Sequence, residues 1–533
     1  MKNRFSVRLL AVVALTVLTP SLLSGCSVNP VTGKSQLSLI SPQQEVAIGE
    51  KNYAPSRQSQ GGDYYLDPAL QTYISDVGKK LAAVSDRPEL PYEFVVLNNQ
   101  VPNAWALPGG KIAINRGLLV ILEDEAQLAA VLGHEIVHAA ARHGAMQMTT
   151  GTLASIGLLT VGAAVQGRPG EQLYGVASQL GAAAWMAKYS RDDELESDYY
   201  GMDYMARAGY DVQGAVELQQ KFVALSESRE ADFFSSLFAS HPPSARRVEA
   251  NRARAANVAP GQRYRQRYQS AIAQLKKDAP AYAAEEKAIE ALADNKPADA
   301  ISHLDRAVAV QPDEGQFWEL RGQAWEKLKN LSNADKAYST AIAKNERYAN
   351  AYFSPYLARG VLRYKQGQTV AAETDLKQSY QLLPTAAASY YLGELALQGN
   401  RLEQANRYFQ QSAQDRGELG NQSREKIQQV NLRLRPQSFL AFSQASSAKG
   451  ALLVNIINTS PRAMRNIVIQ VVGPITSSGY AESKTIALTK TLQPGQQVTI
   501  NTGLSYLLIT DAVISGGQVA RYRVTAESAK LVD

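Results

Sequence analysis

The feature that most constrains this 533-residue sequence is the pentapeptide His-Glu-Ile-Val-His at positions 134–138. It lies in an alanine- and leucine-rich stretch that predicts a buried helix, with Asp124 as its cap and Gly144 as its stop. Four residues advance a helix by about 400°, so both imidazoles stand on one face, one turn apart. This spacing suits one zinc ion, and Glu135 on the same side can act as a general base.

The third zinc ligand must come from another part of the chain. A catalytic zinc usually has three protein ligands and one open position. His143 lies nine residues after His134, about 900° around the helix, so we expect it on the opposite face and not as a ligand. Glu194 and Asp198, one turn apart on an acidic predicted helix, are candidates. On spacing alone, a solvated helix face is the stronger interpretation of this acidic run.

An ordered set of five motifs resembles a known family. The motifs occupy residues 85–92, 103–110, 134–138, 190–198 and 240–247. Together they resemble the zinc metallopeptidases that include HtpX and the CaaX prenyl endopeptidases, and in particular the soluble periplasmic branch of that family. The resemblance covers roughly residues 37–250. It implies a mainly α-helical zincin domain of the gluzincin type with a small β-sheet.

The resemblance also implies roles for individual residues. His134, His138 and Glu194 would bind one zinc ion (Zn²⁺) per chain, and Glu135 would be the general base of peptide hydrolysis. Asp198 would hydrogen-bond to a ligand histidine and so fix its tautomer and orientation.

Two further residues of the family pattern, His241 and Arg247, would lie beside the zinc. Two roles are open for His241. It either stabilises the oxyanion of the tetrahedral intermediate or occupies the open zinc position and holds the enzyme latent. We favour a movable latch.

A short alternating segment predicts a strand that holds substrate. It follows a Pro-Gly-Gly turn and is interpreted as an edge strand. Such a strand can align an extended peptide across the zinc by β-augmentation, which favours unfolded or flexible substrates. Its residues are Lys111, Ile112, Ala113, Ile114 and Asn115.

Beyond the protease motifs the chain repeats itself every 33 to 38 residues. Small residues recur at positions 300, 334, 372 and 405, and large residues follow each of them by four positions. This is the pattern of tetratricopeptide (TPR) helix pairs, which stack into an α-solenoid with a concave binding surface. We expect the repeats to dock a substrate or a partner.

After Arg435 and Pro436 the pattern changes to short β-branched runs at 454–456, 467–472 and 498–500. Turn residues separate these runs. A C-terminal domain of this kind, residues 436–533, is typical of a small β-sandwich. No catalytic residue is assigned to it.

The N-terminus resembles a bacterial lipoprotein signal. Residues 1–25 carry a basic start and an uncharged run, and they end just before Cys26. Cleavage there would leave Cys26 acylated, followed by a linker over 26–40, and Ser27 in place of an aspartate favours the outer membrane. The alternative is an uncleaved transmembrane anchor, against which Pro20 argues.

Composition limits the remaining possibilities. Hydrophobic residues make up 45% and charged residues 20%, which excludes a mostly disordered or fibrous chain. The single cysteine excludes a cysteine-based zinc site. A basic and aromatic run at 263–268 is interpreted as a solvated surface, so we expect no nucleic-acid partner. We therefore expect a multidomain chain with a metallopeptidase domain at 41–255, a linker at 256–281 and TPR repeats at 282–430.

The leading hypothesis is a lipid-anchored periplasmic zinc endopeptidase that cleaves misfolded or unassembled envelope or outer-membrane proteins. Its TPR repeats would dock substrate or the outer-membrane assembly machinery. The alternative is a TPR chaperone or scaffold for outer-membrane protein assembly whose protease is normally latched.

Overall fold

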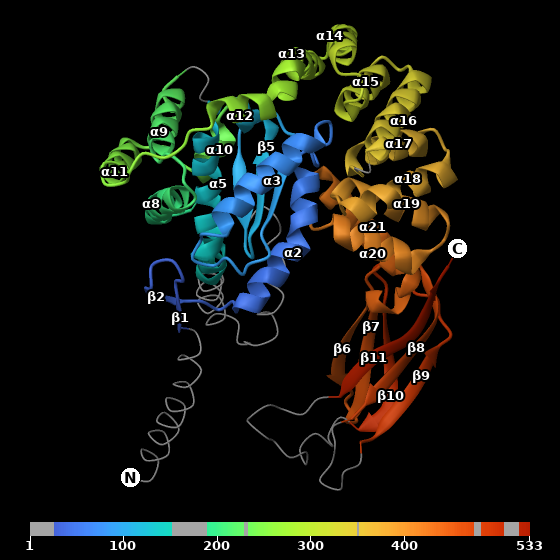
Figure 1. Ribbon diagram of the computed structural model, residues 1–533. Helices are drawn as coiled ribbons and strands as arrows, with labels where there is room; N and C mark the ends of the chain where they lie inside the picture. Colours follow the sequence, from blue (N-terminus) through green and yellow to red (C-terminus); the bar gives the residue numbers. More distant parts are fainter. Residues whose placement is uncertain are drawn as a thin grey trace, which may run out of the picture. The chain divides into compact units, whose positions relative to one another are not determined.

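The structure is a computed structural model that describes residues 26–151, 189–228, 233–348, 351–473, 481–505 and 522–532 (Figure 1). The predicted signal segment, residues 1–25, lies outside these ranges. The chain divides into two compact units, residues 1–359 and 360–533, and each is described by itself. In the described residues no helix combines the length and the apolar character needed to cross a membrane.

The first unit contains a three-stranded sheet of order β3-β5-β4. Its strands are β3 (Glu93–Leu97), β4 (Ala104–Leu107) and β5 (Lys111–Asn115). β5 pairs in parallel with β3 and antiparallel with β4, so it is the central strand. The prediction that residues 111–115 form an edge strand is therefore wrong. Alternation identifies a strand but does not reveal how many neighbours it has.

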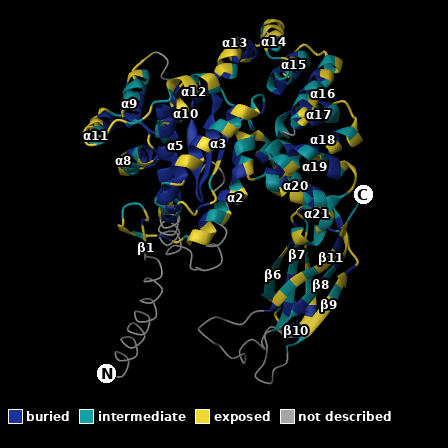
Figure 2. Ribbon diagram, viewed as in Figure 1, coloured by how far each residue is buried: buried dark blue, intermediate teal, exposed yellow. Residues whose placement is uncertain are grey.

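Both faces of this sheet are buried (Figure 2). Because side chains alternate along a strand, each strand contributes to two cores. One core packs the sheet against α3 and α5, and the other packs it against Tyr53 of α2. The residues on the α2 side are Val95, Leu97, Trp105, Leu107 and Ala113.

Helices surround this sheet, and several begin at side chains that cap them. Ser41 forms a capping box with Gln44 at the start of α2, and Asp67 accepts two backbone hydrogen bonds at the start of α3. Proline stands at the first position of both helices, where its missing N–H costs nothing. The helices are α2 (Pro42–Ser59), α3 (Pro68–Ala82), α4 (Arg116–Leu119), α5 (Glu125–Ala140), α8 (Arg191–Arg207), α9 (Gln213–Ser226), α10 (Ser235–Ser240) and α11 (Ala245–Ala255).

Residues 26–40, expected to be a linker, contain a small hairpin. β1 (Cys26–Val28) pairs antiparallel with β2 (Ser35–Leu37). The backbone N–H of Asn29 donates to Lys34 and closes the turn at 2.8 Å.

Residues 256–281, also expected to be a linker, contain α12 (Arg265–Ala271) and the start of α13 (Ala273–Ala293). Tyr268, Ile272 and Leu275 are buried in the main core of the first unit. Their spacing of four and three residues is that of a helix face.

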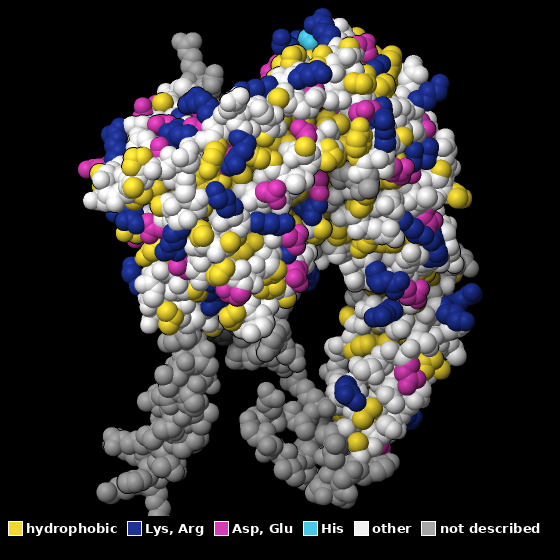
Figure 3. Space-filling view, in the orientation of Figure 1, with side chains coloured by type: hydrophobic (Ala, Val, Ile, Leu, Met, Phe, Trp, Pro, Cys, Tyr) yellow, Lys and Arg dark blue, Asp and Glu magenta, His cyan; other side chains and the backbone are white. Residues whose placement is uncertain are grey.

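The basic run at 263–268 binds the start of α5. Arg263 donates to Asp124 and to Glu217, and Arg267 donates to Glu125. These arginines are thus engaged by carboxylates of the same chain. On the face shown in Figure 3, Lys and Arg side chains are interspersed with Asp and Glu side chains.

The repeat region is a series of antiparallel helix pairs. The helices after α13 are α14 (Pro297–Val310), α15 (Gly315–Lys327), α16 (Leu331–Arg347), α17 (Phe353–Lys365), α18 (Thr369–Leu382), α19 (Ala386–Gln398), α20 (Leu402–Ser412) and α21 (Glu418–Leu434). A Cβ added at Gly322 would lie 2.4 Å from the Tyr338 ring, and one added at Gly393 would lie 2.7 Å from the Phe409 ring. Tyr338 and Phe409, two of the large residues of the sequence pattern, therefore fill the space left by a glycine of the preceding helix.

Beyond the repeats, a 3₁₀ helix (Pro436–Phe439) leads into two three-stranded antiparallel sheets, of order β10-β7-β6 and β11-β8-β9. The strands are β6 (Leu440–Ser446), β7 (Ala451–Asn458), β8 (Met464–Val472), β9 (Ser483–Leu488), β10 (Gln497–Ser505) and β11 (Arg523–Leu531). Buried residues of both sheets form one core, which confirms the predicted sandwich. The three predicted strands correspond to β7, β8 and β10.

Glu319 of α15 gives the repeats a pH-dependent stability. Burial raises the pKa of its carboxyl from 4.5 to about 7, although a hydrogen bond from Ser354 lowers it. The folded chain thus retains a proton that the unfolded chain has lost, so the free energy of unfolding falls as pH rises from 4.5 towards 7. We expect Glu319→Gln to stabilise the chain by about 1–3 kcal/mol above that range and to have little effect at its lower end.

Thermal unfolding at about pH 5 and about pH 8 checks this expectation. The exposed Glu290→Gln variant is the control, since Glu290 lies on the solvent side of α13. An equal effect of Glu319→Gln at both pH values would contradict a buried carboxyl with a raised pKa.

Candidate metal centre

α5 carries His134 and His138, and side-chain hydrogen bonds define where this helix begins and where the chain turns away after it. The Asp124 side chain accepts a hydrogen bond from the Gln127 N–H at 3.0 Å, as predicted for the cap. The helix ends at Ala140, four residues before the predicted stop at Gly144. Arg142 then adopts a left-handed backbone with φ 65°, and its side chain donates to the buried Glu45 and to the Ile40 carbonyl.

Close packing of α5 on α8 places a carboxylate beside these histidines. A Cβ at Gly133 would lie 3.1 Å from the Gly201 carbonyl oxygen, and a Cβ at Gly201 would lie 3.0 Å from the backbone nitrogen of His134. The two backbones therefore approach more closely than larger residues permit. α8 itself begins with a capping box between Ser190 and Asp193, one residue before Glu194.

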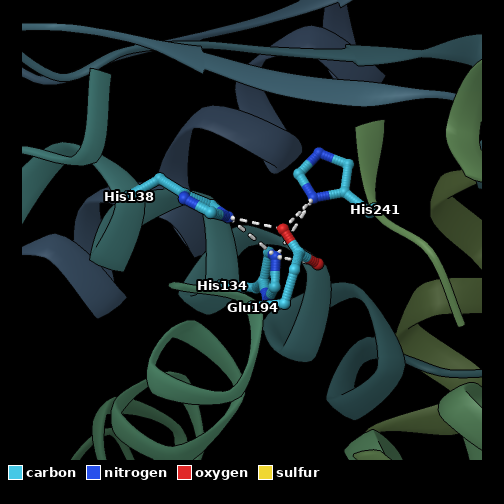
Figure 4. A group of neighbouring side chains, drawn as sticks. All are labelled: His134, His138, Glu194 and His241. Atoms are coloured by element: carbon cyan, nitrogen blue, oxygen red, sulfur yellow. Dashed lines mark hydrogen bonds and ion pairs between the residues drawn. The ribbon is translucent and has the colours of Figure 1, made fainter. Parts of the chain in front are cut away.

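The imidazoles and the carboxylate converge on one point (Figure 4). Each of four buried residues offers a ligand atom, and these atoms all lie within 4.8 Å of one another. Nε2 of His134 lies 3.0 Å from Nε2 of His138, and Oε1 of Glu194 lies 3.4 Å from Nε2 of His138. The fourth residue is His241, which follows α10, and its Nδ1 lies 3.1 Å from Oε1 of Glu194.

Asp198 and Arg247 form hydrogen bonds that position His134 and Glu194. Oδ1 of Asp198 lies 3.0 Å from Nδ1 of His134, so it occupies the ring nitrogen that faces away from the cluster. Arg247 donates to both oxygens of Asp198 and to Oε2 of Glu194, each at 2.7 Å. One buried guanidinium thus positions the carboxylates of two successive turns of α8.

The donor set fits a zinc ion. Two histidines and a glutamate are ligands that zinc prefers in catalytic sites, and the side chains are buried. Oε2 of Glu135 is buried and has no hydrogen-bond partner among the described residues, although a buried carboxylate oxygen is costly to leave unpaired. Its other oxygen lies 3.5 Å from Nε2 of His241. Glu135 is thus positioned to bind a water or a substrate proton at the cluster.

The electrostatics of the cluster differ between its members. Burial raises the pKa of Glu135, which suits a group that must accept and return a proton. Burial also lowers the pKa of His138 well below its usual value, so this imidazole is neutral and able to bind a metal. Burial opposes the charged form of His241, but Glu194 and Glu135 outweigh it and raise the pKa of His241 to about 9.

His143 lies in a different place from the one predicted. Because the helix ends at Ala140, the chain turns and brings Nδ1 of His143 to 2.9 Å from Nδ1 of His138. Nε2 of His143 in turn lies 3.2 Å from Oε1 of Glu196 on α8. His143 is therefore not a ligand, as expected, but it orients a ligand.

Tyr189 is a second residue that sequence reasoning missed. Its ring stacks on His138 with centroids 3.8 Å apart, and its hydroxyl donates to the Ala106 carbonyl of β4 at 3.5 Å. It connects the ligand to the outer edge of the sheet. No motif in the sequence distinguishes it from other tyrosines.

The structure brings seven sequence-predicted residues together and leaves one group apart. His134, Glu135, His138, Glu194, Asp198, His241 and Arg247 form the cluster and its support. Residues 111–115 are instead the paired centre of the sheet, and it is Ala104 of β4 that lines the cavity beside Glu135.

Comparison with known proteins agrees with this geometry. A family model described as peptidase family M48 matches residues 68–255, and a tetratricopeptide repeat model matches residues 285–353 and 357–418. The beta-barrel assembly-enhancing protease of Yersinia pestis is 29% identical over 247 residues, which are 45% of this chain and 50% of that protein. Its counterpart in Escherichia coli K12 is 27% identical over 48% of this chain and 53% of that protein.

A third relative is matched over more of its own length. Metalloprotease YcaL of Escherichia coli K12 is 31% identical over 191 residues, which are 34% of this chain and 72% of that protein. By contrast, the matches span only about half the length of the beta-barrel assembly-enhancing proteases.

Asp198→Asn tests the support of His134. An amide can offer the ring N–H only a neutral acceptor, and it weakens the pairing with Arg247. We expect zinc affinity to fall by about 10–100-fold, as is common for such outer partners. Competition with a chromophoric zinc chelator measures the affinity, and Asp192→Asn on the exposed start of α8 is the control. Unchanged affinity would show that Asp198 does not orient the ligand.

Proposed function

The chain belongs to peptidase family M48, and we propose that it is a zinc-dependent endopeptidase of the bacterial envelope. The observation that carries the proposal is the buried cluster of His134, His138 and Glu194, beside a Glu135 oxygen that has no hydrogen-bond partner among the described residues. This is the donor set and the general base that metal-assisted peptide hydrolysis needs.

Zinc, when bound, supplies Lewis-acid polarisation of a carbonyl and of water. Glu135 accepts the proton of the attacking water and later delivers it to the leaving amine, for which its raised pKa is suitable. His138 and His134 present their Nε2 atoms to the cluster because His143 and Asp198 occupy their outer nitrogens.

We assign substrate alignment to β4 and not to residues 111–115. The Asn115 N–H donates to the Asn103 carbonyl, so in an antiparallel ladder the backbone groups of Ala104 and Ala106 face away from β5. Ala106 is the residue whose carbonyl Tyr189 reaches from the ligand side. An extended peptide paired with β4 would thus run beside the cluster, which favours unfolded substrates.

The repeats are proposed to dock the substrate or an assembly partner. Within the first unit they are fastened to the protease body at buried polar contacts. Glu314, at the start of α15, accepts hydrogen bonds from Asn98 at 2.9 Å and from Tyr282 at 3.1 Å. Glu285 of α13 pairs with Arg116 at 3.4 Å. A protein held by the first repeats is therefore held by the same body that carries the metal centre.

We further propose that the chain is a lipoprotein, acylated at Cys26 and anchored in the outer membrane facing the periplasm. The lipoprotein-like signal over residues 1–25, just before Cys26, supports this location, as does similarity to relatives named beta-barrel assembly-enhancing proteases. The substrates would be misfolded or unassembled envelope proteins, and the outer-membrane assembly machinery would be a partner of the repeats.

A second candidate function has one specific observation in its favour. His241 offers a fourth ligand atom within the cluster, where it would fill the position that a substrate or water needs. A protease held shut in this way would leave the repeats to act as a chaperone or scaffold. The two functions are compatible if His241 moves.

Glu135→Gln separates the functions. We expect cleavage of casein or another unfolded protein to fall by about 10²–10⁴-fold while zinc content stays the same, because Glu135 is not a ligand. Exposed Glu249→Gln on α11 is the matched control. Loss of rescue by Glu135→Gln in a deletion strain supports the protease, whereas retained rescue supports the chaperone.

His241→Ala tests the latch. If His241 occupies the open zinc position, its removal raises cleavage of unfolded protein several-fold, with one zinc still held by the other three ligands. Zinc content and cleavage are measured on the same preparation. A variant that keeps its zinc but loses cleavage would assign His241 to the oxyanion and exclude the latch.

A further inference from the structure

The β1–β2 hairpin at the start of the described chain has two different faces. Its register pairs Ser27 with Gln36 and Val28 with Ser35, and successive residues point to opposite sides. One side meets the protease body, because the buried Asn29 donates to Oε1 of Glu196 on α8 at 2.9 Å.

The other side faces solvent and carries Val28 and Leu37 beside Ser35. Val28 is 57% exposed, Leu37 is 42% exposed, and Leu39, two residues further along, is 49% exposed. Two exposed aliphatic side chains on so short a hairpin, with a third two residues beyond it, differ from the single exposed hydrophobic residues that are normal on a protein surface. Such a patch indicates contact with another apolar phase.

The chain itself indicates which phase that is. The register places position 26 directly opposite Leu37, so the proposed acylation site belongs to the same hairpin. One acyl chain holds a protein to a bilayer only weakly, and a second contact makes the attachment stable. Lys34, exposed at the turn, adds a positive charge that anionic lipid attracts.

We propose that Val28 and Leu37 of the hairpin, together with Leu39 just after it, lie in the interfacial layer of a lipid bilayer, beside Cys26. This inference goes beyond the proposed function and rests on it only for the presence of a membrane.

The contact fixes where cleavage takes place. From Asn29 the chain of close contacts runs to Glu196 at 2.9 Å, to His143 at 3.2 Å and to the ligand His138 at 2.9 Å. The metal centre is thus only a few side chains away from the lipid-facing hairpin. Substrates would be extended segments that lie at the membrane surface.

The test uses an environment-sensitive fluorophore (NBD) on an introduced cysteine. Cys26 is the only cysteine of the sequence, so Cys26→Ser leaves any introduced thiol unique. The chain from residue 26 carries Cys26→Ser and an N-terminal hexahistidine tag, which tethers it to vesicles of phosphatidylethanolamine, phosphatidylglycerol and a nickel-chelating lipid. The probe is placed at Leu37→Cys or Leu39→Cys. Val120→Cys is the matched control, because Val120 is similarly exposed (45%) but precedes the start of α5, far from the hairpin in the sequence.

We expect a blue shift at positions 37 and 39, and strong quenching when the vesicles contain lipid with a nitroxide high on its acyl chain. Position 120 should show neither effect, and adding Val28→Asp should weaken quenching at 39. Equal signals at all three positions would overturn the proposal. So would a shift that depends on protein concentration without vesicles, since it would assign the face to a second copy of the chain.

The outcome does not depend on acylation, because the tag supplies the tether. Mass spectrometry of the N-terminal peptide from chain made in an envelope-bearing host tests acylation of Cys26 separately. Failure of the lipid attachment and failure of the hairpin contact are therefore distinguishable.

Discussion

The close approach of α5 and α8 is the constraint on which the rest of the centre depends. Because Gly133 and Gly201 have no side chains, the two backbones meet, and Glu194 reaches the histidine pair of the neighbouring helix. A wider separation would break the contacts of Glu194 with the buried imidazoles of His134 and His138. The two glycines lie in ordinary helical backbone, so their role is space and not conformational freedom.

Support for the ligands comes from two directions. Asp198 and Arg247 hold His134 from one side, and His143 and Glu196 hold His138 from the other. Both carboxylates lie on α8, so a single helix supplies one ligand and the outer partners of two others. These shared roles explain why Glu194 and Asp198 are buried, although the acidic run to which they belong resembles a solvated surface.

Local pattern predicted much of this protein, and tertiary contacts decided the remainder. The spacing of residues 134–138 predicted the histidine pair, and the small and large residues of the repeats predicted their own packing.

The predicted position of His143 is wrong because the helix ends at Ala140. Glu45 and Ile40, far away in sequence, hold the turn at Arg142. Alternation predicts a strand at residues 111–115 but does not reveal its parallel neighbour β3, so the predicted edge is in fact the centre of the sheet. The helical spacing of Tyr268, Ile272 and Leu275 could have predicted α12 and α13. The hairpin at 26–37 has too few residues for any periodicity.

Arg247 also sets the electrical balance of the centre. The guanidinium pairs with the buried carboxylates of Glu194 and Asp198, whereas the carboxylate of Glu135 lies beside His241. Replacement of Arg247 by a neutral residue would leave the two carboxylates of α8 buried without that positive charge, which is costly. The charge that the centre presents to an ion is thus set in part by a residue outside the ligand cluster.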